Sequence, residues 1–306
     1  MNYAVETNGL SRSYGDVQAL RDVTVQIMHQ EIFGFIGPDG AGKTTLFRLL
    51  TTLLKPDSGN ATVLGYDIEI DFREIRPLLG YMPGRFSLYM DLSVEENIRF
   101  FASVFGTTLE ENYELVKPIY SQLEPFKSRL AGNLSGGMKQ KLALCCALIH
   151  KPRLLILDEP TTGVDAVSRK EFWEMLHRLK EQGIPIIVST PYMDEARQCD
   201  RVALIQNGSV MRIDKPDLIS GSLERDLYAI KASEKYRLLQ VLRSYPNTYS
   251  VQPFGDSVHY IDLREGVDTE EILGYLKGEG FNSLSVNKIK PGIEDLFMEL
   301  MQKEET

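Results

Sequence analysis

Apolar and polar positions along the first two thirds of the chain switch repeatedly between two periods, which predicts strands interleaved with helices. Short apolar or alternating runs predict strands, whereas apolar residues spaced three and four apart predict helices. The predicted strands include 4–7, 23–28, 31–37, a short strand within 54–68, 78–82, 154–158 and 184–190. The predicted helices are 44–54, several within 92–150, 166–182 and one beginning at Asp194. This alternation indicates an α/β fold.

Local signals mark where several of these elements begin and turn. Ser93 stands three residues before Glu96, which is the capping-box pattern of a helix start. Ser135 precedes the long helical stretch at 136–150. Asn207-Gly208 between two apolar runs predicts a β-hairpin.

The pattern changes after a boundary segment at 216–226, so the chain is predicted to hold two domains. The order beyond it is strand, helix, two hairpin-linked strands, helix and strand, which matches a ferredoxin-like module of about 80 residues. We therefore expect a first domain over 1–220, with a helical subdomain over about 84–150, and an accessory domain over 221–306.

Composition narrows the class of protein. The chain has 306 residues, of which 43% are hydrophobic and 25% charged, as in ordinary globular proteins. A net charge of -9 argues against a nucleic-acid partner held by phosphate contacts. The first residues lack a signal-peptide pattern, and no apolar run approaches the ~20 residues of a membrane span. Cys145, Cys146 and Cys199 lack metal-ligand spacing, so reduced buried thiols are expected.

The segment GPDGAGKTT fits the phosphate-binding loop template G-x4-G-K-[ST] between a predicted strand and a predicted helix. Glycines let backbone N–H groups converge on phosphate oxygens, and the helix N-terminus adds a partial positive charge. Lys43 is expected to reach the β- and γ-phosphates, and the Thr44 hydroxyl to bind Mg²⁺. The expected nucleotide-contacting positions are Gly37, Pro38, Asp39, Gly40, Ala41, Gly42, Lys43, Thr44 and Thr45.

A carboxylate pair follows the apolar run LLIL. Asp158 and Glu159 stand where the carboxyl end of a buried parallel strand is expected, and ligands of open α/β sheets bind at such ends. Asp158 is suited to a Mg²⁺ contact, and Glu159 to polarising the water that attacks the γ-phosphate. With the phosphate loop, this pair predicts a nucleoside-triphosphate hydrolase in which Lys43 and Glu159 are the catalytic residues.

Three further motifs carry a family resemblance: Tyr14, LSGGMKQ at 134–140 and the Gly163-Val164-Asp165 loop. Together with the phosphate loop and LLILDEP, they resemble the ATP-binding cassette ATPases of ABC transporters. Within that family the chain is most similar to the YbhF-type ATPases of ABC-2 exporters, and PGIEDLFMEL at 291–300 is similar to the end of their C-terminal extension.

The resemblance implies a P-loop ATPase fold and a head-to-tail dimer that sandwiches two ATP molecules with Mg²⁺. Tyr14 would stack on adenine, and Ser135, Gly136 and Gly137 would contact the ATP bound by the partner cassette. The implied partners are a second cassette and transmembrane permease subunits, and the implied location is cytoplasmic, on the inner face of the cell membrane.

Two positions depart from the family pattern. Gly84 stands where the family has glutamine, and Pro191 stands where it has histidine. Neither residue offers a polar side chain, so hydrolysis at the chain's own site is expected to be slow. One hypothesis is a heterodimer with a more active cassette, and the other is a homodimer with a modified mechanism. A regulatory ATP-binding cassette with little turnover and a non-transport ABC ATPase remain alternatives.

Overall fold

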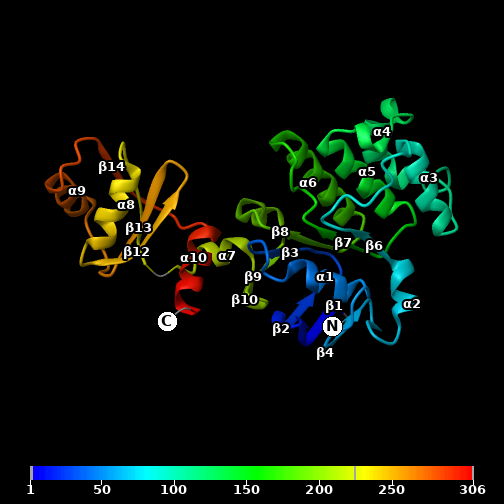
Figure 1. Ribbon diagram of the computed structural model, residues 1–306, viewed down its shortest axis with the longest axis horizontal. Coiled ribbons are helices and arrows are strands. Elements are labelled where there is room, and N and C mark those ends of the chain that lie inside the picture. Colours follow the sequence, from blue (N-terminus) through cyan, green and yellow to red (C-terminus); the bar gives the residue numbers. More distant parts are fainter. Residues whose placement is uncertain (1–2, 224, 305–306) are drawn as a thin grey trace. The chain divides into compact units, whose positions relative to one another are not determined.

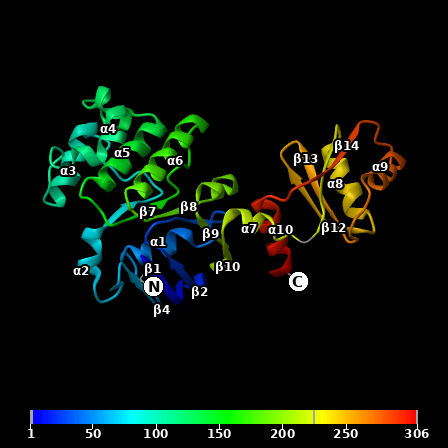
Figure 2. The same ribbon diagram turned by 180° about the vertical axis from the view of Figure 1, so that it is seen from behind.

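A computed structural model of the chain describes residues 3–223 and 225–304 (Figures 1 and 2). The chain divides into two compact units, Met1–Lys215 and Pro216–Thr306. The sequence placed the boundary five residues later, at 220/221. The difference is the short helix α7 (Pro216–Ser220), which belongs to the second unit because it packs against α10 (Ile293–Glu304).

The first unit is built on a six-stranded sheet. Its strand order is β10-β9-β3-β8-β7-β6, in which only β10 runs antiparallel to its neighbour. The strands are β3 (Ile32–Ile36), β6 (Leu79–Met82), β7 (Leu154–Asp158), β8 (Ile186–Thr190), β9 (Arg201–Gln206) and β10 (Ser209–Asp214). Every residue of β3, β7 and β8 is buried, which explains their near-continuous apolar runs.

A second sheet and a central helix complete the core of this unit. The sheet is antiparallel, with the order β2-β1-β4-β5, and comprises β1 (Val5–Tyr14), β2 (Val17–Ile27), β4 (Ser58–Val63) and β5 (Tyr66–Asp67). Helix α1 (Lys43–Leu50) contributes Leu46, Phe47, Leu49 and Leu50 to one apolar cluster with residues of both sheets. This packing fixes the start of α1, and with it the phosphate loop, against the large sheet.

The remaining helices of the unit gather on the other side of the large sheet (Figures 1 and 2). They are α3 (Val94–Val104), α4 (Tyr113–Leu123), α5 (Gly136–Leu148) and α6 (Ala166–Glu181), while the short α2 (Phe72–Ile75) lies before β6. The capping box of Ser93 and Glu96 is present at the start of α3. Lys141 of α5 donates to Glu171 of α6 at 2.6 Å.

One predicted helix is wrong in type. The segment after Pro191 forms a six-residue 3-10 helix, η4 (Met193–Gln198), rather than an α-helix beginning at Asp194. The Asp200 amide already donates to Ile32 of β3, and β9 begins at Arg201, so the segment has room for two turns at most. The predicted hairpin at Asn207-Gly208 is confirmed, because both residues have positive φ between β9 and β10.

The second unit has the strand and helix order that the sequence predicts. Its antiparallel sheet has the order β12-β13-β11-β14, with α8 and α9 connecting the strands. The bounds are β11 (Leu227–Ala232), α8 (Lys235–Ser244), β12 (Thr248–Phe254), β13 (Ser257–Asp262), α9 (Thr269–Gly278) and β14 (Leu284–Ile289). Both helices bury leucines against one face of the sheet, which is the ferredoxin-like arrangement.

Candidate active site

The candidate site lies at the carboxyl ends of four adjacent parallel strands. Ile36 at the end of β3 pairs with Thr190 at the end of β8, and Asp158 at the end of β7 pairs with Ser189 of β8. Strand β6 flanks β7 and ends at Met82. The loops that leave these strands therefore emerge at one edge of the sheet, where ligands of open α/β folds bind.

The phosphate loop connects β3 to α1, and its glycines are required by close contacts. A Cβ at Gly37 would lie 2.1 Å from the Ile205 carbonyl oxygen. Gly42 has a φ of +105°, and its Cβ would lie 2.5 Å from the Ala19 carbonyl oxygen. The loop is held from outside because the Gly208 amide donates to the Ala41 carbonyl at 3.0 Å. Only glycine lets the chain curl this tightly beside β2 and β9.

Lys43, the first residue of α1, is the buried cation of the site. Its side chain is 3% exposed, and Nζ donates to the carbonyls of Gly37 at 2.8 Å and Pro38 at 2.9 Å. The same Nζ lies 3.3 Å from Glu159 Oε1. The lysine therefore joins the phosphate loop to the carboxylate pair, two motifs more than a hundred residues apart in sequence.

Asp158 and Glu159 are held by Ser189, a residue that the sequence analysis did not single out. The Ser189 hydroxyl donates to Asp158 Oδ1 at 2.6 Å and accepts from the Glu159 amide at 2.9 Å. Asp158 is 2% exposed, and Glu159 has a φ of +49°, a backbone conformation that non-glycine residues rarely adopt.

The charge of Asp158 also acts on Tyr81 of the neighbouring strand β6. Burial of the Tyr81 phenol, and secondarily the negative charge of Asp158, raises the pKa of Tyr81 to about 12.

The two departures from the family pattern both adjoin this centre. A Cβ at Gly84 would lie 3.5 Å from Asp158 Oδ2, so a side chain there would lie against the carboxylate. Pro191 directly follows Thr190, whose carbonyl accepts from the Gly37 amide at 3.3 Å. Both positions therefore border the chain's own phosphate loop.

The signature residues lie at the start of α5 and contact a different loop. Ser135 is the N-cap and accepts from the Met138 amide at 3.3 Å. A Cβ at Gly136 would lie 3.0 Å from the Gly163 carbonyl oxygen, and one at Gly137 would lie 2.7 Å from Ser168 Oγ. These glycines let the start of α5 pack closely on the loop before α6 and on the first turn of α6.

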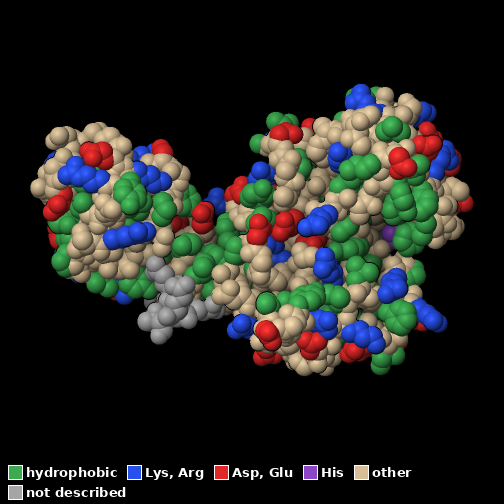
Figure 3. Space-filling model, viewed as in Figure 1, with side chains coloured by type: hydrophobic (Ala, Val, Ile, Leu, Met, Phe, Trp, Pro, Cys, Tyr) green, Lys and Arg blue, Asp and Glu red, His purple; other side chains and the backbone are tan. Residues whose placement is uncertain are grey.

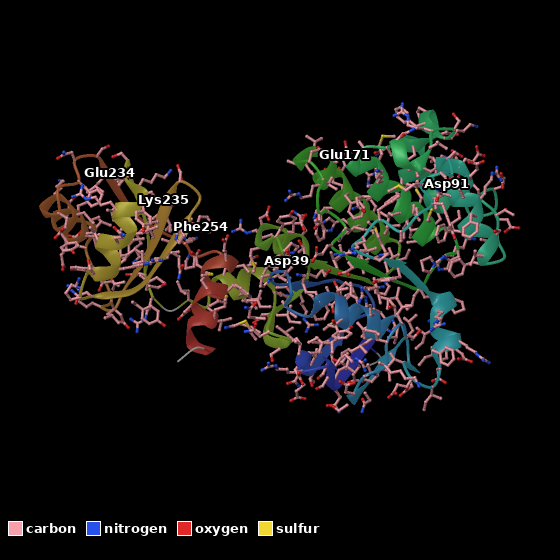
Figure 4. All side chains as sticks on the ribbon, viewed as in Figure 1. Asp39, Asp91, Glu171, Glu234, Lys235 and Phe254 are labelled. Carbon is pink, nitrogen blue, oxygen red and sulfur yellow. The ribbon has the colours of Figure 1, made fainter. Side chains whose placement is uncertain are left out.

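The other predicted nucleotide contacts lie around the phosphate loop. Tyr14 ends β1, is 42% exposed, and has the Arg12 guanidinium 5.6 Å from its ring centroid. Strand β2, which pairs with β1, places the Ala19 carbonyl oxygen next to Gly42 of the phosphate loop. Asp39 is exposed, so its charge is solvated (Figure 4).

The centre provides few protein ligands for a metal ion. Across residues 3–223 and 225–304, no group of three or more His, Cys, Asp and Glu side chains is arranged to hold one. Thr44 at the start of α1 and the buried Asp158 offer hard oxygen atoms, the kind that Mg²⁺ prefers alongside phosphate oxygens. These residues therefore fit a Mg²⁺ ion that arrives with a nucleotide.

Comparisons with known proteins agree on one family. The family model described as ABC transporter matches residues 20–162. The probable multidrug ABC transporter ATP-binding protein YbhF of Escherichia coli K12 is 38% identical over 98% of this chain and 53% of that protein, so the chain spans about half its length. The Nod factor export ATP-binding protein I of Sinorhizobium fredii is 34% identical, over 98% of this chain and 87% of that protein.

Solved structures of ATP-binding cassettes resemble about seven tenths of the chain. An ATP-binding subunit of an ABC transporter is 30% identical, with a TM-score of 0.64 over 71% of this chain and 91% of that chain. A dimeric ATP-binding cassette in a post-hydrolysis state, bound to ADP and Pi, is 25% identical with a TM-score of 0.62, over 69% of this chain and 98% of that chain.

Proposed function

The chain belongs to the ATP-binding proteins of ABC transporters, and we propose that it binds and hydrolyses ATP as the motor subunit of an exporter of this family. The observation that carries the proposal is the contact of Lys43 Nζ with Glu159 Oε1 at 3.3 Å, directly beside the buried Asp158. The relative named for Nod factor export supports the export direction.

Binding uses the loop and the start of α1. The backbone N–H groups of Gly42–Thr45, at the helix N-terminus, attract phosphate oxygens. Lys43 then exchanges its two carbonyl acceptors for the β- and γ-phosphates, and Tyr14 offers its exposed ring face to the adenine. A bound Mg²⁺ would be held by Thr44 and Asp158, and it would offset the negative charge of the phosphates.

Hydrolysis relies on Glu159. The carboxylate orients and polarises the attacking water, while Ser189 fixes the backbone of Glu159 and the carboxylate of Asp158. Without nucleotide, Lys43 neutralises Glu159; once Lys43 moves to the phosphates, Glu159 is free to accept a proton from water. The ion pair is therefore the resting form of the catalytic pair.

The rate at this site is proposed to be low. Gly84 places no side chain beside Asp158, and Pro191 places neither an imidazole nor an amide N–H beside the phosphate loop. Removing one preorganised donor or acid-base group costs about 10²–10⁴ in rate. The chain would then bind ATP firmly and turn it over slowly.

The signature side is proposed to serve a second cassette. Ser135 and the open amides of Gly136 and Gly137 form a helix N-terminus suited to a phosphate. Gly84 and Pro191 both border the phosphate loop, whereas the signature residues are all present. We therefore propose a heterodimer with a more active cassette. A homodimer with a modified mechanism is the competing arrangement, and the dimeric relative with ADP and Pi is compatible with either.

A groove offers a place for the membrane subunits. A cavity of about 280 Å³ lies between the large sheet and the helical region, and its lining includes Leu53, Tyr81, Phe101 and Phe105. Hydrophobic side chains gather on the surface near α3 (Figure 3). Over the part of the chain that the structure describes, no helix is long and apolar enough to cross a membrane. We propose that permease subunits dock in this groove and hold the protein at the inner face of the cell membrane.

Phosphate release from Mg-ATP by the purified chain tests the proposal. We expect slow release by the unmodified protein and about 10³-fold slower release by Glu159→Gln. Glu114→Gln is the matched control, because Glu114 has an 82% exposed side chain. Binding without any release, unchanged by Glu159→Gln, would favour a regulatory cassette instead.

A further inference from the structure

The end of β1 is held by an ion pair that the proposed mechanism does not use. Arg12 Nη1 donates to Asp57 Oδ1 at 2.6 Å and to the Lys55 carbonyl at 3.2 Å. The other carboxylate oxygen of Asp57 accepts from the Ser13 amide at 2.6 Å, and the Asp57 amide donates to the Ser11 carbonyl at 2.9 Å. Asp57 therefore fixes the guanidinium of Arg12 together with the backbone on both sides of it.

This ion pair lies near the surface, so its main effect is on geometry. The side chains of Arg12 and Asp57 are 27% and 43% exposed. Exposed ion pairs add little to the free energy of unfolding. The pair does, however, hold a positive charge at one fixed place beside the last residue of β1.

The fixed guanidinium lies over the ring of Tyr14. Its central carbon is 5.6 Å from the ring centroid, within the range of cation–π attraction. An exposed tyrosine ordinarily changes rotamer within nanoseconds, and Tyr14 is 42% exposed. Attraction to a cation that is itself held in place favours one orientation of the ring. Because Arg12 lies over one ring face, the opposite face is the one left for a flat ligand.

The oriented ring belongs to a hairpin that touches the phosphate loop. Strand β1 ends at Tyr14, and Arg12 pairs with Leu20 of β2. A Cβ at Gly42 would lie 2.9 Å from Leu20 Cδ2 and 2.5 Å from the Ala19 carbonyl oxygen. A general distortion of this hairpin would therefore disturb the phosphate loop, whereas a change in the orientation of the ring alone would not.

A ring that is already oriented binds a base more tightly than one that becomes ordered on binding. Ordering one flexible side chain weakens an association by about two- to twelvefold. Stacking on tyrosine requires a flat aromatic group, and in ATP only the base is one. The benefit of the oriented ring should therefore appear in ligands that carry a base and be absent from ligands that lack one.

We propose that Arg12 is a positioning residue for the nucleotide base. Held by Asp57, it orients the Tyr14 ring for stacking and does not itself contact ATP. The inference rests on the proposed binding of ATP at the phosphate loop, and it assigns part of the affinity to the base end of that site. The rate of hydrolysis once ATP is bound should not depend on Arg12.

Calorimetry on the full chain compares Mg-ATP with ribose 5-triphosphate, which lacks only the base. In Arg12→Met, affinity for ATP should fall about fivefold, and affinity for ribose 5-triphosphate should stay within twofold. In phosphate-release assays KM for ATP should rise by about the same factor, while kcat changes less than twofold. Arg73→Met is the matched control and should change neither affinity, because Arg73 also lies over an aromatic ring, 5.7 Å from the Phe72 centroid on α2.

A double-mutant cycle tests whether Arg12 acts through the ring. In the Tyr14→Ala background, Arg12→Met should cause no further loss of ATP affinity. A loss that persisted there would mean that Arg12 contacts the nucleotide directly, and it would overturn the positioning role.

Asp57→Asn is the second variant if Arg12→Met fails to fold. It removes the charge that anchors the guanidinium and should weaken ATP binding about threefold, without an effect on ribose 5-triphosphate. Equal losses for the two ligands would overturn the inference, because they would indicate a structural role of the hairpin. Unchanged ATP affinity in both variants would overturn it as well. If the unmodified chain bound neither ligand, the proposed function itself would be contradicted, and this inference with it.

Discussion

The phosphate-loop side and the signature side of the cassette differ in how complete they are. Around the loop, Lys43, Asp158 and Glu159 are tightly connected, yet Gly84 and Pro191 bring no polar side chain to the same centre. At the start of α5, by contrast, Ser135, Gly136 and Gly137 match the family signature, and the two glycines pack closely on Gly163 and on the first turn of α6. The difference suggests that the chain still binds ATP and still contacts the ATP of a partner cassette, while its own rate of ATP hydrolysis is reduced.

The comparison also shows that the residue holding the two carboxylates in place is not one of the two positions that depart from the family pattern. Ser189 keeps Asp158 and Glu159 in place through hydrogen bonds of 2.6 and 2.9 Å, without any help from positions 84 and 191. The carboxylates can therefore persist after the residues that assist catalysis are gone. The predictions below test each side in turn.

Glu159→Gln should have the largest effect. The carboxylate that polarises water becomes a neutral amide of the same shape, so phosphate release should fall by about 10³-fold while ATP binding persists. Single-turnover release of phosphate measures the rate. Unchanged release would mean that another group performs the chemistry and that the phosphate-loop side is not organised as described.

Introducing the family's glutamine and histidine at positions 84 and 191 should increase the rate of hydrolysis. Gly84→Gln with Pro191→His should raise phosphate release by about 10–100-fold, because the first adds a polar group beside Asp158 and the second adds one beside the phosphate loop. Crowding should limit this increase in rate, because a Cβ at position 84 would lie only 3.3 Å from the Asp158 carbonyl oxygen. The two single variants serve as controls. A double variant as slow as the parent would show that these positions do not limit the rate.

Ser189→Ala tests whether the carboxylates depend on their anchor. The buried Asp158 loses its hydroxyl donor, which should lower turnover about tenfold and the free energy of unfolding by about 1–3 kcal/mol. Chemical denaturation and phosphate release report the two effects. Ser103→Ala, at an exposed position of α3, should change neither.

Ser135→Ala should have the smallest effect on the isolated chain. Loss of the N-cap should cost about 1 kcal/mol of stability and leave ATP affinity of the monomer unchanged. ATP-dependent dimerisation, followed by light scattering in the Glu159→Gln background, should weaken about tenfold. Ser93→Ala removes the N-cap of α3 and is the matched control. If it weakened dimerisation equally, the signature side would have no special role.

Much of this site could be predicted from sequence because its residues follow buried apolar strands. Lys43, Asp158 and Glu159 stand at strand or helix ends, and parallel strands bring such ends together. Ser189 escaped notice because a serine within an apolar run carries no motif, and only the pairing of β7 with β8 places it beside Asp158. The 3-10 form of η4 depends on the position of β9, which local sequence does not encode.

Equilibrium retention of Mg-ATP, measured with single-turnover phosphate release in the same sample, tests the central claim most directly. The account predicts about one ATP held per chain, slow release of phosphate, and at least a tenfold loss of affinity in Lys43→Ala, because that lysine exchanges its carbonyl partners for phosphates. Failure to hold ATP, or equal retention by Lys43→Ala, would contradict it.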